Sequence, residues 1–534
     1  MQSTVAALLW RAVAEWGIER VYGVAGDAIF PLLDALGRTQ SLRYIGAVSE
    51  TGAAFMAGGE ARATGRPGLC IATAGPGAAN LVNAVADAYR DEIPLLVITG
   101  QVETGKVATA AKQYIDQQQL FAPITAMTVT LTRPESAIDI LKAAMEKAIG
   151  DRVPCQITIP KDIQSSPAPE IVAIPALGAP QLPKMQGDID QVADLLNQCK
   201  RPLVIVGRRA LPFRDELLQL TEALGAGIIP GQGARAIVPA TDKRFLGGLG
   251  EAHIPEPLAR ADLILLIGAS PFEHKFIPAH IAVAQIDTHP KWLAHELRPC
   301  SLTGDVAAIL PMLVEKAQQD RPDSAWIGEI EQAHDALLAM IAPVGQENSP
   351  KGSSEPIDPP QVISLLNDRV PPDAIIAVDT GEFMHWFDRG FLPKRQQVIL
   401  SENWRSIGAA LPYAIGAQAA EPGKRVVVLT GDGGLPLTLT EIVTAVRHQL
   451  PVVVLVFHDR RYALEADRME KAGLKPLGTD LAPLDFAAVA IACGAEGFRV
   501  SESSQLPAAL ATAMTREKPV VVDIEMGSAR PLFL

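Results

Sequence analysis

Short, uninterrupted apolar runs recur along the chain, with helix-like stretches between them. Seven runs rich in valine, isoleucine and leucine occupy residues 68–74, 94–100, 202–207, 263–268, 374–379, 426–431 and 452–459. Strands that are apolar throughout, rather than at every second residue, are typical of parallel sheets buried on both faces. Their alternation with helices indicates βαβ units. The sequence therefore predicts an α/β fold built on doubly wound parallel sheets.

Two proline-rich segments interrupt this rhythm and predict the limits of the domains. Residues 164–184 and residues 343–360 each hold five prolines. Proline lacks a backbone N–H and has a fixed φ, so clusters of it suit exposed linkers. The 534 residues therefore divide into 1–163, 185–342 and 356–534. Each part is large enough for one doubly wound domain.

Composition and charge argue against several classes of protein. The 60 acidic and 47 basic residues give a formal net charge of −13, which argues against a nucleic-acid-binding surface. The longest apolar run has about seven residues, whereas a membrane span needs about 20. No basic region precedes a long apolar stretch at the N-terminus, so no signal peptide is expected. The five cysteines are widely spaced, which argues against a disulfide framework and favours a cytoplasmic location.

The most informative local pattern combines a glycine turn with two strands. The apolar run 426–431 leads directly into Asp432-Gly433-Gly434, and the run 452–459 ends in a carboxylate. Between the two runs, Thr438 and Glu441 have the spacing of a capping box, which predicts the start of a helix.

These features predict a site for a phosphate group and a metal ion. Parallel strands end at one edge of the sheet, where doubly wound folds bind their ligands. Glycines let the backbone approach a ligand closely, and a helix N-terminus favours a phosphate. Asp432 and Asp459, with a backbone carbonyl, can hold Mg²⁺. The alternative is an ordinary tight turn between a strand and a helix.

The same segment resembles the metal-diphosphate motif of thiamine diphosphate enzymes, in which GDG is followed, after a further apolar strand, by Asn or Asn-Asn. The resemblance implies thiamine diphosphate and Mg²⁺ as cofactors, with Asp432, Asp459 and the carbonyl of Arg461 as metal ligands. The residues implied to line the diphosphate are Gly431, Gly433, Gly434 and Tyr462. One departure is that His458-Asp459 replaces the usual Asn-Asn, which keeps a ligand oxygen but adds a negative charge.

Glu50 is the candidate for cofactor activation. It follows a strand-like segment and leads a stretch of small residues that is typical of a buried helix. Thiamine diphosphate enzymes have a glutamate here, usually after a histidine, that hydrogen-bonds the aminopyrimidine ring and promotes loss of the thiazolium proton. The resemblance implies this role for Glu50, although Ser49 replaces the histidine. The alternative is an acid placed at a helix N-terminus by the helix dipole.

The resemblance extends over nearly the whole chain. Gly26 lies in a turn similar to the one near the pyrimidine, and residues 73–80 resemble the GPG loop of acetolactate synthases and pyruvate oxidases. Residues 379–381 resemble the first cofactor strand of the third domain. Ser406 and Ile407 fall where the family places a bulky apolar residue under the cofactor, so Ile407 takes that role. The implied fold has a pyrimidine-binding domain, a central domain and a diphosphate-binding domain, each doubly wound.

Lys112 and Gln113 bear on the choice of substrate. The most similar subgroup, pyruvate oxidase and acetolactate synthase, has a Phe-Gln-Glu segment that reaches the active site. The matching stretch keeps Gln113 but has Lys112 in place of the phenylalanine. A buried ammonium group needs an anion beside it, so Lys112 predicts a more acidic substrate or acceptor than pyruvate. The alternative is a lysine that points to solvent.

The resemblance implies an enzyme that decarboxylates a 2-oxo acid and transfers or ligates the resulting acyl carbanion, as acetolactate synthase does. A simple decarboxylase and a flavin-containing oxidase similar to pyruvate oxidase are alternatives. A non-catalytic regulatory subunit is disfavoured because Glu50, Asp432 and Asp459 are all present. A nicotinamide dehydrogenase is disfavoured because no strand is followed by GxGxxG.

The central part of the chain gives the least information. The turn after its first apolar run, Gly207-Arg208-Arg209, is not rich in glycine, so the sequence does not decide whether FAD binds. The two arginines could hold another phosphate-bearing ligand or form salt bridges. The family resemblance also implies a homodimer or homotetramer with the active site between subunits.

Overall fold

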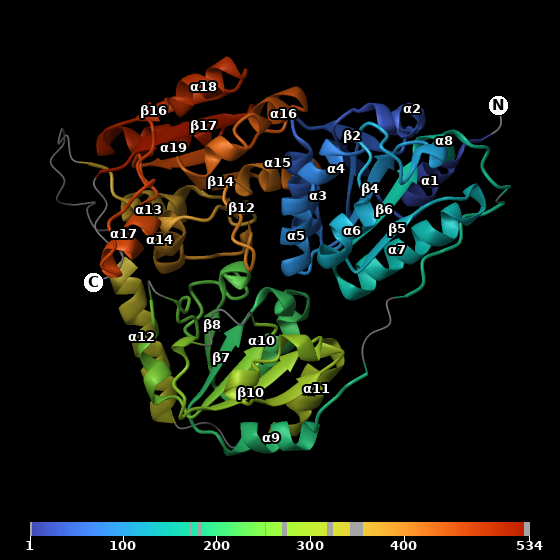
Figure 1. Cartoon of the computed structure of the whole chain (residues 1–534). Helices are drawn as coiled ribbons and strands as arrows, with labels where there is room; N and C mark the ends of the chain where they lie inside the picture. The colour runs from blue at the N-terminus through green and yellow to red at the C-terminus, as the bar shows by residue number, and fades with distance from the viewer. Residues whose placement is uncertain are drawn as a thin grey trace.

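The computed structural model describes residues 3–170, 172–179, 184–250, 253–269, 275–317, 324–341 and 356–527. These residues form three parallel sheets with helices on their faces, each in its own part of the chain (Figure 1). The predicted fold class is confirmed. Most of the second proline-rich segment, 343–360, lies outside the described residues, and the domain boundaries stay a prediction.

The first sheet has six strands in the order β2-β1-β3-β4-β6-β5. Its strands are β1 (Arg20–Gly23), β2 (Arg43–Gly46), β3 (Gly68–Ala72), β4 (Leu95–Gln101), β5 (Met127–Thr130) and β6 (Pro154–Pro160). The helices of this part are α1 (Val5–Glu15), α2 (Phe30–Gly37), α3 (Glu50–Thr64), α4 (Pro76–Asn80), α5 (Val82–Arg90), α6 (Gln117–Phe121), α7 (Ala137–Asp151) and α8 (Lys161–Ser165).

The central sheet has five strands in the order β11-β10-β9-β7-β8. Its strands are β7 (Pro202–Val206), β8 (Gly227–Pro230), β9 (Leu263–Ile267), β10 (Ala282–Asp287) and β11 (Cys300–Thr303). The helices of this part are α9 (Ile189–Gln198), α10 (Arg214–Leu224), α11 (Val306–Lys316) and α12 (Ser324–Ile341).

The third sheet, β13-β12-β14-β15-β17-β16, has the same topology as the first. Its strands are β12 (Ile375–Val378), β13 (Gln397–Leu400), β14 (Val426–Gly431), β15 (Val453–His458), β16 (Glu496–Val500) and β17 (Val520–Glu525). The helices are α13 (Pro359–Arg369), α14 (Glu382–Gly390), α15 (Ala410–Ala420), α16 (Glu441–Arg447), α17 (Ala463–Lys471), α18 (Phe486–Ala492) and α19 (Leu506–Ala513).

The first and third parts of the chain share one hydrophobic core. Helices α3 and α15 lie side by side between the two sheets (Figure 1). The rings of Phe55 and Tyr413 meet edge to face, with centroids 5.4 Å apart. A Cβ on Gly59 would overlap the backbone of Tyr413, and one on Gly416 would overlap the carbonyl of Met56. Glycines on both helices therefore permit a very close approach of the backbones.

Two findings bear on the exclusions made from the sequence. No helix in the described part of the chain is long and apolar enough to span a membrane. All five cysteines are free thiols.

Candidate active site

A pocket of about 300 Å³ lies at the carboxyl edge of the third sheet. Strands β12 and β14 are neighbours there, and the chain leaves them toward opposite sides of the sheet. Such a switch point is where doubly wound sheets bind ligands. The residues predicted from the sequence that line the pocket are Ile407, Gly431, Asp432, Gly433, Gly434, Asp459, Arg461 and Tyr462. The structure thus brings together residues up to 55 positions apart, from Ile407 to Tyr462.

The glycine turn after β14 has no room for side chains. A Cβ on Gly433 would overlap the ring of Tyr462, and one on Gly434 would lie 2.7 Å from a carboxylate oxygen of Asp379. The Tyr462 hydroxyl donates a hydrogen bond to the carbonyl of Gly433 at 3.3 Å. The turn is therefore fixed on one side, with its backbone along the pocket wall, as a cradle for a phosphate group requires.

The two carboxylates of the pocket repel each other, and Asp432 is buried whereas Asp459 is half-buried. Burial, and then the charge of Asp459, raises the pKa of Asp432 to about 6. Burial also raises the pKa of Asp459. The backbone N–H groups of Arg460 and Arg461 donate to Asp432 at 2.5 Å and to Asp459 at 3.0 Å, respectively. A divalent cation would favour the ionised form of both groups.

This donor set fits a metal ion bound together with a diphosphate. Two carboxylates and one carbonyl leave coordination positions for phosphate oxygens and water, as Mg²⁺ prefers. Within the described residues, no group of three or more His, Cys, Asp or Glu side chains is arranged to hold a metal. The predicted third ligand is a backbone carbonyl, that of Arg461, and the metal assignment stays a prediction.

His458, the first residue of the unusual His-Asp pair, faces away from the pocket lining. Its Nδ1 lies 2.8 Å from a carboxylate oxygen of Asp523 on β17, and its Nε2 lies 4.0 Å from Asp432. The hydrogen bond with Asp523 raises the pKa of His458. The side chain is buried. The histidine therefore anchors the end of β15, and only Asp459 of the pair lines the pocket.

Ile407 enters the pocket from the loop between β13 and α15. The next residue, Gly408, donates its N–H to Asp379 at 2.9 and 3.0 Å, and its carbonyl accepts from the Thr438 hydroxyl at 2.6 Å. Gly408 has a φ of +80°, which favours glycine. Ser406 does not line the pocket; its hydroxyl oxygen accepts from the Asn83 amide of α5 at 3.0 Å.

The predicted capping box was wrong. Thr438 donates to Gly408 instead of capping α16, which begins at Glu441 after a short 3-10 helix, Leu435–Leu437. The fully buried Glu441 carboxylate accepts from the N–H of Val48 and of Ser49, at 3.1 and 2.9 Å. Glu441 therefore stabilises the beginning of α3 in the first part of the chain rather than its own helix.

Glu382 is a site residue that the sequence did not reveal. It lines the pocket as the first residue of α14. Burial raises its pKa to about 7, opposed by the hydrogen bond from the Trp386 indole and reinforced by the charge of Asp459. The sequence feature that could have indicated Glu382 is its position directly after residues 379–381, at the end of a predicted strand.

The predicted residues of the first sheet form a second cluster. Glu50 begins α3 and accepts from the Asn80 amide at 3.0 Å; its other oxygen lies 3.1 Å from the place of a Cβ on Gly77. Gly26 packs against Thr73. Gln113 packs against Gly75 and has a φ of +66°. All of these residues lie beyond the carboxyl ends of strands of the first sheet.

Neither Glu50 nor its neighbours line the 300 Å³ pocket of the third sheet. Lys112 and Gln113 are exposed. The described residues of one chain thus contain two separate clusters of predicted site residues, one with the glutamate and one with the carboxylates. The roles of Glu50, Lys112 and Gln113 stay predictions.

A doubly wound sheet whose switch point combines a glycine cradle with two carboxylates defines an α/β enzyme that binds a phosphorylated cofactor. Three family models identify the cofactor. Residues 3–120 match the N-terminal TPP binding domain of thiamine pyrophosphate enzymes, 189–313 match their central domain, and 379–524 match their C-terminal TPP binding domain. The chain belongs to the thiamine pyrophosphate enzymes, and it depends on that cofactor.

Named relatives are similar over almost the full chain. The catabolic acetolactate synthase of Raoultella terrigena is 30% identical, over 95% of this chain and 92% of its own length. The putative thiamine pyrophosphate-containing protein YdaP of Bacillus subtilis is 27% identical, over 99% and 92%. The pyruvate oxidase of Lactiplantibacillus plantarum is 27% identical, over 98% and 89%. The predicted subgroup, similar to acetolactate synthase and pyruvate oxidase, is confirmed.

Proposed function

We propose that this protein decarboxylates a 2-oxo acid and ligates the remaining fragment to a second carbonyl compound, with thiamine diphosphate and Mg²⁺ bound. The observation that supports this most is the pocket that joins Asp432, Asp459, the glycine turn and Ile407. When bound, thiamine diphosphate supplies the carbon nucleophile and the electron sink for decarboxylation. Asp432, Asp459 and the carbonyl of Arg461 would hold the metal, and the turn 431–434 would cradle the diphosphate.

The test is mass spectrometry of the products formed from a panel of 2-oxo acids, with and without aldehyde acceptors. We expect a ligated hydroxy ketone or hydroxy-oxo acid to accumulate. Release of free aldehyde alone would support the simple decarboxylase. If the protein binds thiamine diphosphate and Mg²⁺ but consumes no 2-oxo acid, the proposal is wrong.

We propose that the active site forms between two subunits of a homodimer or homotetramer. Glu50 lies outside the pocket of its own chain, where it is hydrogen-bonded to Asn80. A second copy could bring its first sheet, with Glu50, against the pocket of the third sheet. Such an exchange of half-sites between identical chains is compatible with two-fold symmetry.

Complementation between inactive variants tests this arrangement. Glu50→Gln and Asp432→Ala, expressed together, would form mixed dimers in which one site carries both changes and the other carries neither. Random pairing would then restore about one quarter of the wild-type sites. If each site lies within one chain, the co-expressed variants remain as inactive as either alone.

The central part of the chain favours salt bridges over a second phosphate-bearing ligand. Arg209 pairs with Asp287 at 2.8 Å, and its guanidinium lies 4.2 Å from the centre of the Trp292 ring. Arg208 pairs with Glu402 at 3.4 Å. Since both arginines are engaged, we propose a structural role for them. The visible absorbance spectrum of the purified protein tests for FAD, and a flavin spectrum would favour the oxidase.

We further propose a cytoplasmic location. The free thiols are compatible with it, and burial raises the pKa of Cys70 and of Cys155 to about 12, which keeps these two unreactive. Cell fractionation with an antibody against the protein tests this proposal.

A further inference from the structure

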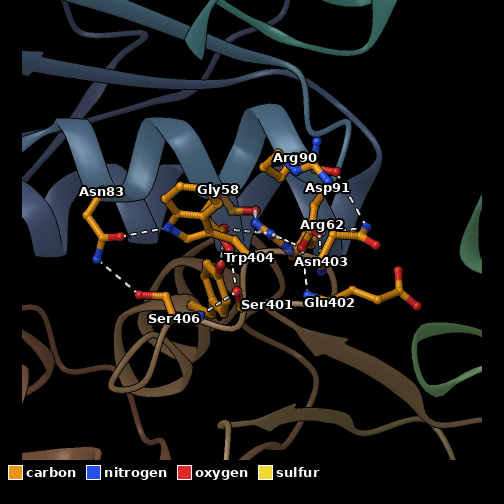
Figure 2. A network of polar contacts seen from close by, with 12 residues as sticks. Gly58, Arg62, Asn83, Arg90, Asp91, Ser401, Glu402, Asn403, Trp404 and Ser406 are labelled. Carbon is orange, nitrogen blue, oxygen red and sulfur yellow. Dashed lines mark hydrogen bonds and ion pairs between the residues drawn. The ribbon is translucent and has the colours of Figure 1, made fainter. Parts of the chain in front are cut away.

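The loop that carries Ile407 is anchored to the first part of the chain. Residues 401–407 follow β13 and precede α15, and they lie against α3 and α5 (Figure 2). On the outer side, the Trp404 indole donates to the Asn83 side chain at 2.9 Å, and the Asn83 amide donates to the Ser406 hydroxyl at 3.0 Å. These contacts join residues more than 300 positions apart.

On the inner side, two buried carboxylates hold the loop. Asp91 accepts from the backbone N–H of Glu402 at 2.9 Å and of Asn403 at 2.8 Å. Asp87 accepts from the Ser401 hydroxyl at 2.5 Å, and the Ser401 oxygen accepts from the Ser406 N–H at 2.9 Å. Asp87 therefore connects, through Ser401, to both ends of the loop.

A single arginine holds both carboxylates. Arg62, near the end of α3, is buried and donates to Asp91 at 2.8 Å (Figure 2). It also donates to Asp87 at 2.7 Å. Its guanidinium lies 4.3 Å from the centre of the Tyr413 ring, and the Tyr413 hydroxyl donates to Asp87.

The two carboxylates differ in electrostatic setting. Burial raises the pKa of Asp87. Burial also acts on Asp91, but Arg62, Arg208 and the N–H groups of the loop together lower its pKa. Asp91 thus holds its charge for the backbone donors that it binds.

The free-energy cost of burying this cluster indicates its role. Removing one cation and two carboxylates from water is costly, and well-packed apolar side chains would stabilise the contact between the helices and the loop equally well. What apolar side chains cannot do is accept hydrogen bonds from backbone N–H groups. The cluster therefore specifies one conformation of the loop rather than adding general stability.

We propose that Asp87 and Asp91 are positioning residues, which fix loop 401–407 in the conformation that places Ile407 in the cofactor pocket. The proposal rests on the proposed function, because it treats Ile407 as a cofactor contact. The two carboxylates act through the backbone of the loop. The first part of the chain would thereby shape the pocket of the third part.

Asp91→Asn is the sharpest perturbation. Both oxygens of Asp91 accept: one from Asn403, the other from Arg62 and from Glu402. In either orientation, the amide would point its NH₂ group at donors. Charge-assisted hydrogen bonds are about twice as strong as neutral ones, so the variant should hold loop 401–407, and with it Ile407, less firmly. We therefore expect Asp91→Asn to bind thiamine diphosphate with Mg²⁺ about tenfold more weakly than the wild type does.

Glu60→Gln is the matched control. Glu60 lies on α3 and, like Asp91, is a buried carboxylate bound by an arginine. It accepts from Arg20 at 2.9 and 3.0 Å and from the Tyr22 hydroxyl at 2.7 Å. Its loss should lower the melting temperature as much as Asp91→Asn does. Because its partners are not in loop 401–407, its cofactor affinity should stay within about twofold of wild type.

Trp404 provides a readout that needs no cofactor. The residue is 45% exposed, and comparison with Trp404→Phe identifies its share of the tryptophan emission. Asp91→Asn should shift that emission to longer wavelength in the metal-free protein, and Glu60→Gln should not. Ser401→Ala removes the hydroxyl that links Asp87 to the Ser406 N–H. It should shift the emission as well, and it carries the test if Asp91→Asn does not fold.

Two results would overturn the proposal. The first is wild-type emission and wild-type cofactor affinity in Asp91→Asn, or in Ser401→Ala if Asp91→Asn does not fold. The second is an equal change of emission and affinity in Glu60→Gln. A wild-type protein that does not bind thiamine diphosphate would instead contradict the proposed function. The emission measurement would still decide whether the carboxylates hold the loop.

Discussion

Asp379 offers a direct test of how charge is used to hold the site. It follows β12 and is buried, with its two oxygens accepting from the N–H of Gly408, from the Thr430 hydroxyl at 2.8 Å and from the Thr380 N–H at 2.9 Å. Burial raises its pKa from 3.8 to about 6. Its ionised form therefore destabilises the folded protein at neutral pH, and the anchoring of Gly408 offsets part of that cost.

The sign and size of the effect follow from linkage. The folded protein binds a proton at Asp379 more tightly than the unfolded chain does, so stability increases as pH falls through the folded pKa of about 6. Between pH 7 and pH 5 this one group adds about 1.3 kcal/mol to the free energy of unfolding. For the third domain, predicted to span residues 356–534, this change in the free energy of unfolding corresponds to a rise of roughly 3–5 °C in melting temperature.

Asp379→Asn removes the titration but keeps an acceptor oxygen for Gly408. Calorimetric scans in EDTA at pH 7 and pH 5 would give the change in melting temperature for both proteins. We expect the wild type to gain roughly 3–5 °C more than the variant on going from pH 7 to pH 5. Other groups with raised pKa values, such as Asp432 and Glu382, shift both proteins equally. Equal gains in the two proteins would refute the reasoning.

Three further predictions concern the cofactor and the substrate. Glu50→Gln should keep the fold and cofactor binding but lose roughly 10²–10⁴-fold in turnover, measured beside a thermal melt of the same preparation. Asp432→Ala should weaken Mg²⁺ and thiamine diphosphate together in calorimetric titrations, whereas Asp459→Asn, which keeps a ligand oxygen, should still bind both; unchanged binding in Asp432→Ala would contradict the metal assignment. Lys112→Phe should lower the ratio of kcat/KM for a dianionic over a monoanionic 2-oxo acid, and an unchanged ratio would mean that Lys112 points to solvent.

Seven of the inner strands were predictable because they are apolar on both faces. All seven apolar runs are strands, and β3, β4 and β15 are buried at every residue. Edge strands gave no such signal. In β5 all four residues are half-buried, and β16 combines a glutamate and an arginine with its apolar residues. A strand with one neighbour need not be apolar throughout, so its sequence resembles that of a loop.

The two carboxylates of the pocket were predictable because each lies at the end of a strand that the sequence also predicts, whereas Ile407 follows β13, which was not predicted, and came from the family resemblance. Asp432 comes directly after β14, and Asp459 comes directly after β15. Because these two parallel strands are neighbours, the topology of the sheet brings both carboxylates to the same edge. Glu382 was missed because an acid at the start of a helix is ordinary, and its perturbed pKa depends on burial, which only the packed structure supplies.

Contacts between distant parts of the chain could not be predicted from local spacing. Thr438 and Glu441 have the spacing of a capping box, yet Glu441 caps α3, whose first residue is Glu50, across 392 positions. At its other end the same helix holds loop 401–407 through Arg62. Helix α3 is thus bound to the third part of the chain at both ends, and each contact lies beside a predicted cofactor residue. A buried carboxylate needs hydrogen-bond donors, and it takes them from whichever part of the chain the fold brings close. Tertiary partners therefore override local capping, and here they do so beside the two clusters of predicted cofactor residues.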